Sequence, residues 1–403
     1  MSVANFIRYE LYVLSFMLPF GFWPELLLVF SVATYIGLIS VFFILAFPDK
    51  FHISSYLILP LIFIFFTLPS LVQGNDYMPV LLSFFGYILI IILMTSSFVK
   101  FEHIESFLRI YFYALSLLSF LIVMALLGYV DFGSYFNLPL VEIIWGIPRV
   151  LGTESNPNAF GVFYILGVIL PINYFFLSES WSKKIIYLTI TGLMLIVLFF
   201  TYSRSSMIAV AVSIVIYLYY KNSTRKLTEL YGLFFLVAFF LGYIEYQYGS
   251  MPALDQGVEN LLRDKATSSG SRIEILYQTI NIFIDDIFFG IGSNQLKAET
   301  VLRGLSLELT AHNSLLAIAV DFGIFALIAY ALLLIVLTYR FILVIKRQKN
   351  DRIRSNYSAI LGVFIGFFVN GLVHEGYVNV LMWVVIALMM LILIKNKKFE
   401  VAA

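Results

Sequence analysis

Long runs of apolar residues recur along most of the chain, separated by short polar connections. These runs approach the ~20 residues that a helix needs to cross the ~30 Å hydrocarbon core of a bilayer. Backbone in lipid must satisfy its own hydrogen bonds, and the alternating segments of membrane β-barrels are not seen in the sequence, so the runs predict helices. We place these helices at residues 9–23, 25–47, 56–73, 79–98, 107–129, 158–178, 185–202, 205–220, 228–248, 312–338, 357–373 and 378–394.

The composition supports this interpretation. Of the 403 residues, 61% are hydrophobic and 12% are charged, whereas a soluble domain carries about 25% charged residues. The net charge of +1 gives no global field that would attract nucleic acid, so we expect no such partner. The sequence has no cysteine, which excludes disulfides, thiolate catalysis and cysteine-based metal sites.

The distribution of lysine and arginine predicts which side each connection faces. The N-terminus lacks the pattern of a cleavable signal, so we expect the first span to be retained. With this terminus inside, most basic residues fall in inner connections, and Arg149 and Arg204 are the exceptions in short outer ones. We predict an all-α, polytopic membrane protein with about twelve transmembrane helices and both termini inside. Residues 1–403 would form one membrane domain, with an outer loop subdomain carrying short helices at 249–311, between the ninth and tenth spans.

Two polar clusters lie where helices are expected to begin on the outer side. In the first, Arg149 precedes Asn156, a suitable N-cap, and Pro157, a suitable first helical residue. In the second, Ser203 and Arg204 lie in a tight joint between two spans. Burying an arginine in lipid costs roughly 2.5–3.5 kcal/mol on insertion scales, so Arg204 must pair, reach the head groups or meet an anion. A capped helix and a head-group anchor are the simpler alternatives for the two clusters.

A third cluster lies in the long outer loop. Apolar residues recur at helical spacing and predict an amphipathic helix lying on the bundle, through Ile273, Leu276, Ile280, Ile284 and Ile287. Arg272 in its first turn opposes the helix dipole, and an anionic ligand would remove that conflict. The following Gly290 and Gly292 predict a flexible turn rather than a dinucleotide-binding motif. The adjacent acidic residues 285 and 286 diverge on a helix, so we expect no metal and no cofactor.

The fourth cluster opens the tenth span with Ala311, His312 and Asn313, and His374 is a second outer histidine. A single histidine is more often structural than catalytic, and the buried-span residue Asp321 is expected to form an interhelical hydrogen bond. Taken together, arginines beside outward-facing helix N-termini favour phosphate, and a neutral imidazole is a suitable general base near pH 7. The four clusters therefore predict an outer-leaflet site for a phosphate-bearing lipid.

At these residues the chain resembles the O-antigen polymerase and O-antigen ligase superfamily of bacterial envelope glycosyltransferases. The resemblance covers roughly residues 145–330. It rests on the order and common membrane side of several short motifs: Arg149-x-x-Gly152 with Asn156-Pro157-Asn158, Ser203-Arg204, Gly290-x-Gly292, and Ala311-His312-Asn313 followed by Gly323. It implies a fold like that of the C-type glycosyltransferases, in the bacterial inner membrane, with the outer face periplasmic.

The resemblance also implies roles for the site residues. Arg204, Arg272 and Arg149 would bind the pyrophosphate of an undecaprenyl-pyrophosphate-linked oligosaccharide, and His312 would activate the acceptor hydroxyl. Supporting polar residues would be Asn313, Ser203, Asn156, Asn158 and His374. The implied reaction is metal-independent inverting transfer. The acceptor is either a second lipid-linked repeat unit, as in an O-antigen, capsular or exopolysaccharide polymerase with a possible chain-length regulator as partner, or the lipid A core, as in a ligase. A lipid-linked oligosaccharide flippase is a further alternative.

Overall fold

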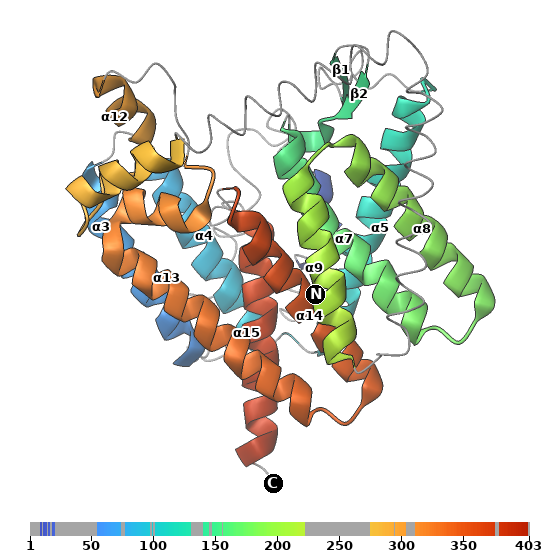
Figure 1. Ribbon diagram of the computed structural model, residues 1–403. Coiled ribbons are helices and arrows are strands. Elements are labelled where there is room, and N and C mark those ends of the chain that lie inside the picture. The colour runs from blue at the N-terminus through green and yellow to red at the C-terminus, as the bar shows by residue number, and fades with distance from the viewer. Residues whose placement is uncertain are drawn as a thin grey trace.

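The computed structural model describes residues 9, 11–13, 15, 16, 18–20, 55–73, 77–96, 99, 101–129, 140–144, 147–154, 156–221, 275–293, 295–303, 311–374 and 379–401. Most of them are helical (Figure 1). The helices are η1 (Leu18–Phe20), η3 (Ser55–Leu57), α3 (Ile58–Gln73), α4 (Tyr77–Thr95), α5 (Phe101–Leu126), η4 (Gly152–Glu154), α7 (Pro157–Leu177), α8 (Trp181–Phe200), α9 (Arg204–Tyr220), α12 (Leu296–Leu302), α13 (Ser314–Arg347), α14 (Asp351–Gly371) and α15 (Val380–Val401).

The helices lie where the apolar runs predict them. The run at 158–178 corresponds to α7 and the run at 205–220 to α9, each within a residue or two at both ends. Four described helices are long and apolar enough to cross a membrane, namely α5 from Glu102, α7, α8 and α13, and shorter apolar helices accompany them. The predicted spans at 25–47 and 228–248 lie outside the described residues, so the count of twelve stays a prediction.

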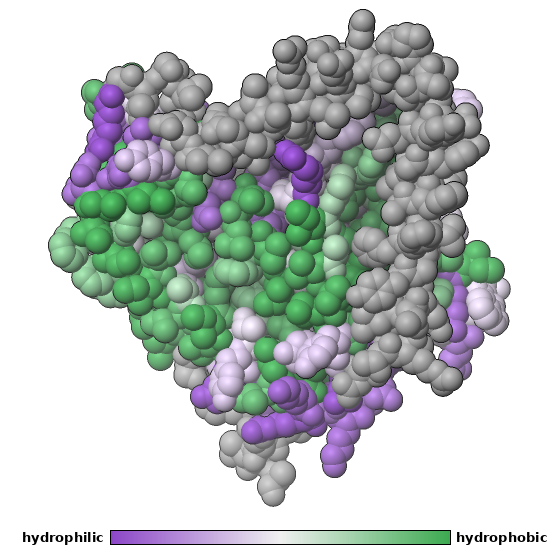
Figure 2. Space-filling view, in the orientation of Figure 1, coloured by the Kyte–Doolittle hydropathy of each residue, from purple (hydrophilic) through white to green (hydrophobic). Residues whose placement is uncertain are grey.

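The surface has the polarity expected of a helical membrane protein. Figure 2 shows an apolar belt across the middle of the visible face, with hydrophilic side chains gathered toward its two ends. Large apolar side chains point outward from several helices, among them Leu117 on α5, Ile185 on α8 and Ile335 on α13. Exposure of such side chains to lipid costs little free energy, whereas their exposure to water would be unfavourable.

A small β-hairpin departs from the predicted all-α fold. Strands β1 (Val141–Ile144) and β2 (Ile147–Val150) pair antiparallel, with Glu142 opposite Arg149. Figure 1 shows the hairpin at the end of the bundle where α5 ends and α7 begins. The two strands are too short for the apolar pattern to have revealed them.

Helices α9 and α14 pack closely because small residues line their interface. Gly362 and Gly366 on α14 face Ser213 and Ala209 on α9, and a Cβ atom added to Gly362 would lie 2.5 Å from the Ser213 carbonyl oxygen. Small residues at this spacing let membrane helices approach backbone to backbone. Since α9 begins where α14 ends, the pair fixes Asn370 of α14 beside the first turn of α9.

Aromatic side chains fill the space between α3, α4, α13 and α15. The buried Trp383 of α15 stacks on Tyr87 of α4, with 5.2 Å between the ring centroids, and on Phe63 of α3. Phe63 also contacts Tyr330 of α13. This aromatic cluster joins α3, α4, α13 and α15 into one group of helices. Helices α5, α7, α8 and α9 form another group, and α14 packs between the two.

The predicted flexible turn at Gly290 and Gly292 is instead a fixed joint. Its backbone pairs with a kink in α13, where Gly323 has φ of 81° and ψ of −178°. Ile291 N donates to Val320 O at 2.8 Å, and Ile324 N donates to Ile287 O at 2.8 Å. A Cβ atom at Gly290 or Gly323 would overlap the backbone of the other segment, so the two glycine motifs serve one close backbone contact.

The outer-loop helix is present over its described residues 275–285, but it faces the other way from our expectation. The predicted protein-facing stripe is exposed, with Leu276 at 43%, Ile280 at 39% and Ile284 at 59%. The buried side is formed by Thr279 and Ile282. Lipid accepts an apolar stripe as readily as a protein core does, and interfacial helices use such stripes to enter the head-group region.

Candidate functional site

Arg149 belongs to strand β2 of the hairpin and lies against the joint that connects α8 to α9. Its Nε donates to Thr201 O at 3.4 Å, and Glu142 is its cross-strand neighbour. Burial lowers the pKa of the Arg149 guanidinium below its usual value, and the carboxylate of Glu142 opposes part of this shift. Arg149, one of the two arginines that violate the charge bias, is therefore half-buried against protein, where it contacts the turn that carries Arg204.

The α8–α9 joint is a strained turn with a polar interior. Tyr202 has φ of 53°, in the left-handed region that few non-glycine residues adopt. The buried N-cap residue Ser203 donates its backbone N–H to Thr201 Oγ1 at 3.1 Å, and its hydroxyl bonds to Ser206 Oγ at 3.0 Å. Arg204 is the first residue of α9 and is exposed. The turn thus holds the Arg204 backbone firmly while its side chain faces outward.

The start of α7 lies beside this turn. Asn156 is the N-cap and Pro157 the first helical residue, as predicted, and Asn156 Oδ1 accepts from the backbone N–H of Asn158 at 2.9 Å. One turn into the helix, a Cβ atom at Gly161 would lie 2.7 Å from Ser206 Oγ. Asn156 is exposed and Asn158 half-buried. The N-termini of α7 and α9 therefore open at the same end of the bundle.

His312 precedes the N-cap of α13 and has φ of 45°, the second such strained residue. Asn313 Oδ1 accepts from the backbone N–H groups of Leu315 and Leu316, at 2.9 and 3.0 Å, and its Nδ2 donates to Leu372 O at 2.9 Å. Ser314 Oγ donates to the backbone oxygen of His374 at 2.8 Å. The half-buried His312 is thus fixed next to the end of α14.

The end of α14 connects these clusters. Asn370, which is 2% exposed, donates from Nδ2 to Ser206 Oγ at 3.2 Å. Two residues later, Leu372 accepts from Asn313. Arg149, Arg204 and His312 therefore lie at one end of the bundle, joined by a continuous series of contacts. Arg272 lies outside the described residues.

Comparison with known families agrees with the resemblance in the motifs. Residues 189–331 match the family model described as O-antigen ligase. Through this segment, the chain is similar to the superfamily of O-antigen ligases and polymerases. No curated protein matches the chain.

The O-antigen ligase segment contains most of the candidate site. It includes the α8–α9 joint with Arg204, the position of Arg272, and His312 with the kinked start of α13. Arg149 and the start of α7 precede it. The match supports glycosyl transfer of the ligase or polymerase type.

The electrostatics of this end favour an anion. Helices α7, α9 and α13 begin here, and helix N-termini present backbone N–H groups with a partial positive charge. Arg204 occupies the first position of α9, where a cation conflicts with the helix dipole unless an anion lies nearby. Among the described residues, no group of three or more histidine, aspartate or glutamate side chains lies close enough to hold a metal ion.

Sequence reasoning missed two residues that organise this site. Asn370 carries the contact between α14 and α9, and a buried amide at the end of an apolar span was the available signal. Tyr202 supplies the left-handed turn, and nothing in its identity indicates that conformation.

A cavity of about 400 Å³ lies elsewhere, at the opposite end of α5, α7, α8 and α14. A much smaller pocket, of about 10 Å³, lies beside Ser314 and Leu372 at the candidate site. The larger cavity does not include Arg149, Arg204 or His312, so it requires a separate explanation.

Proposed function

We propose that the chain is a bacterial inner-membrane polymerase that joins undecaprenyl-pyrophosphate-linked oligosaccharide repeat units of an O-antigen, capsule or exopolysaccharide at the periplasmic face. The observation that carries the proposal is the placement of Arg149, Arg204 and His312 at the end of the bundle where α7, α9 and α13 begin. The family match to residues 189–331 supports the reaction class. Both termini would then be cytoplasmic, with a periplasmic subdomain at 249–311.

The reaction would be a single displacement. His312 takes the proton from an acceptor hydroxyl, and the hydroxyl oxygen attacks the anomeric carbon of the donor glycan. The bond from that carbon to the pyrophosphate oxygen breaks, the anomeric configuration inverts, and undecaprenyl pyrophosphate leaves with the bonding electrons. Arg204 and Arg272 stabilise the negative charge on the leaving group. Arg149, through Thr201, holds the turn that presents Arg204.

A ligase that transfers the glycan to the lipid A core is the second candidate, because the matching family model is described as O-antigen ligase. Both enzymes use the same donor and the same displacement, and they differ in the acceptor. The acceptor would be recognised by residues on the outer surface around His312. The two activities are therefore distinguished by the product that forms.

A deletion strain tests the choice. Loss of a polymerase should leave single repeat units on the lipid A core, whereas loss of a ligase should leave polymer on the carrier lipid. Purified protein mixed with two lipid-linked repeat units should form longer glycans, and the His312→Ala variant should not. Translocation of the lipid-linked unit without a new glycosidic bond would overturn the proposal in favour of a flippase.

A further inference from the structure

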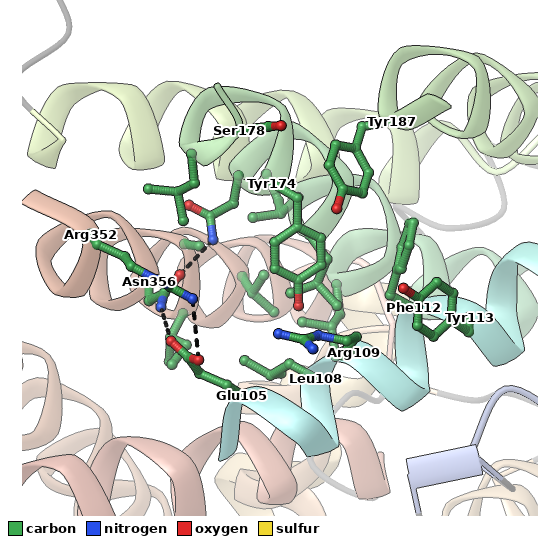
Figure 3. A pocket seen from close by; sticks show the side chains of 18 of the residues that line it. Glu105, Leu108, Arg109, Phe112, Tyr113, Tyr174, Ser178, Tyr187, Arg352 and Asn356 are labelled. Atoms are coloured by element: carbon green, nitrogen blue, oxygen red, sulfur yellow. Dashed lines mark hydrogen bonds and ion pairs between the residues drawn. The ribbon is translucent and has the colours of Figure 1, made fainter. Parts of the chain in front are cut away.

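The cavity at the opposite end of the bundle is lined by polar and charged side chains that the proposed transfer reaction does not use. It is enclosed by the N-terminal parts of α5, α8 and α14 and the C-terminal part of α7. Its charged residues are Glu105 and Arg109 of α5, Lys183 of α8 and Arg352 of α14. Figure 3 shows Glu105, Arg109 and Arg352 among the side chains that line it. This is the end that the distribution of basic residues predicts to be cytoplasmic.

A network of hydrogen bonds forms one wall of the cavity. Asn173, which is 2% exposed, donates from Nδ2 to Asn356 Oδ1 at 2.7 Å. Asn356 Nδ2 donates in turn to Glu105 Oε1 at 3.1 Å. The Asn173 oxygen accepts from the hydroxyls of Ser355, at 2.7 Å, and Tyr217, at 3.2 Å. These bonds tie four helices together, so the wall is built before any ligand arrives.

The charge around the cavity is positive. Its lining contains three cations, Arg109, Lys183 and Arg352, and the single carboxylate of Glu105. Glu105 is already bound by Asn356 and by Arg352, whose Nη2 lies 3.5 Å from Glu105 Oε2. Figure 3 shows the Arg109 guanidinium below the Tyr174 ring, among the side chains that line the cavity. The surplus of positive charge, beside hydroxyl and amide donors, favours an anion such as a phosphate.

The remaining walls identify the ligand as an amphiphile. Apolar side chains of α5, α7 and α14 also line the cavity, including Leu108, Leu170 and Ile360. At its edge, Tyr113 is 58% exposed and begins an apolar stripe along the outer face of α5, followed by Leu117 and Phe120 at 48% and 52%. These three residues recur at helical spacing and run from the cavity along the second half of α5.

We propose that this cavity binds the phosphate head group of an anionic membrane lipid whose acyl chain lies along the Tyr113–Leu117–Phe120 stripe. Arg109 and Lys183 bind the phosphate. Glu105, paired with Arg352, holds the Asn356 side chain in the cavity wall. A free phosphate would satisfy the cations but would leave the apolar stripe unused. The lipid is a ligand of the cytoplasmic leaflet, distinct from the lipid-linked glycans of the proposed reaction.

The test measures lipid binding to the full-length protein in neutral detergent, by native mass spectrometry and by thermal denaturation. Phosphatidylglycerol should bind and raise the unfolding temperature, while phosphatidylcholine and inorganic phosphate at the same concentration should not. Removing two cations in Arg109→Gln/Lys183→Gln should weaken phosphatidylglycerol binding by about 5-fold for each charge lost. Lys346→Gln, which removes an exposed cation outside the cavity at the same end, is the matched control.

Three results would overturn the proposal. Equal binding of phosphatidylcholine would show that the head-group charge is not recognised. Stabilisation by inorganic phosphate equal to that by the lipid would assign the cavity to a soluble anion. An equal effect of the double variant and of Lys346→Gln would place the lipid elsewhere on the surface. If the double variant fails to fold, Lys183→Gln alone keeps the test decisive, because loss of this one exposed cation should weaken phosphatidylglycerol binding by about 5-fold and an unchanged affinity would overturn the proposal.

Discussion

His312 offers the most direct test of the proposed mechanism, because its backbone and its side chain can be varied separately. The residue has φ of 45°, a conformation that costs an ordinary L residue about 1–2 kcal/mol but suits glycine and asparagine. Alanine at this position removes the imidazole and retains the backbone strain. Asparagine and glycine remove the imidazole and relieve the strain. The three variants therefore separate a chemical role of His312 from a conformational one.

The expected result is a loss of activity in all three variants with different effects on stability. Loss of a general base lowers a rate by about 100- to 10,000-fold. The unfolding temperature in detergent should be lowest for His312→Ala and higher for His312→Asn and His312→Gly. The activity assay is the initial rate of glycan extension from lipid-linked repeat units, with each variant first shown to insert in the membrane.

The opposite pattern would refute the reasoning. If His312→Asn or His312→Gly extends glycans at nearly the wild-type rate while His312→Ala does not, the residue is needed for its left-handed backbone and not for its imidazole. The general base would then have to be another residue. The left-handed backbone of His312 would serve to position Asn313 as the N-cap of α13.

Three further variants test other parts of the structure. Arg204→Lys should lose most activity, measured as the same extension rate, because lysine lacks the planar fork that grips phosphate oxygens; full activity would reduce Arg204 to a head-group anchor. Gly366→Ala should lower the unfolding temperature, since its Cβ atom would overlap α9, whereas Gly192→Ala has open space around it and should not; equal effects would contradict the close packing. Asn370→Leu and Ser206→Ala should each slow extension, and the double variant should be no slower than one of them, because both remove the same bond; additive losses would show that this bond does not position the site.

The sequence predicted the helices well because their signals are local. An apolar run of about 20 residues marks a span wherever it occurs, and the Asn156-Pro157 pair marks the start of α7 through the backbone geometry of just these two residues. The direction in which a helix faces is not local. Leu276 and Ile284 face outward, although their spacing suggested a protein contact, because lipid and protein interior are equally apolar neighbours.

The candidate site was predicted in part, through residues that conflicted with their surroundings. Arg149 and Arg204 stood out because they violate the charge bias of short connections. Contacts between distant segments gave no such signal. The pairing of Gly290 with Gly323 and the bond from Asn370 to Ser206 depend on how α13 and α14 pack, which no pattern within either helix reveals.

Backbone strain and the candidate site coincide in this structure. Among the described residues, the non-glycine residues with positive φ are Tyr202 and His312. Each costs of order 1–3 kcal/mol and persists only where surrounding contacts fix it. For Tyr202 those contacts come from the Thr201–Ser203 bond and from Arg149, and for His312 from the cap and cross-helix bonds of Asn313. Both sets of contacts depend on the pairing of α9 with α14, because the end of α14 bonds to each side. The small-residue interface of that pair is therefore a requirement of the site's geometry as well as of the fold.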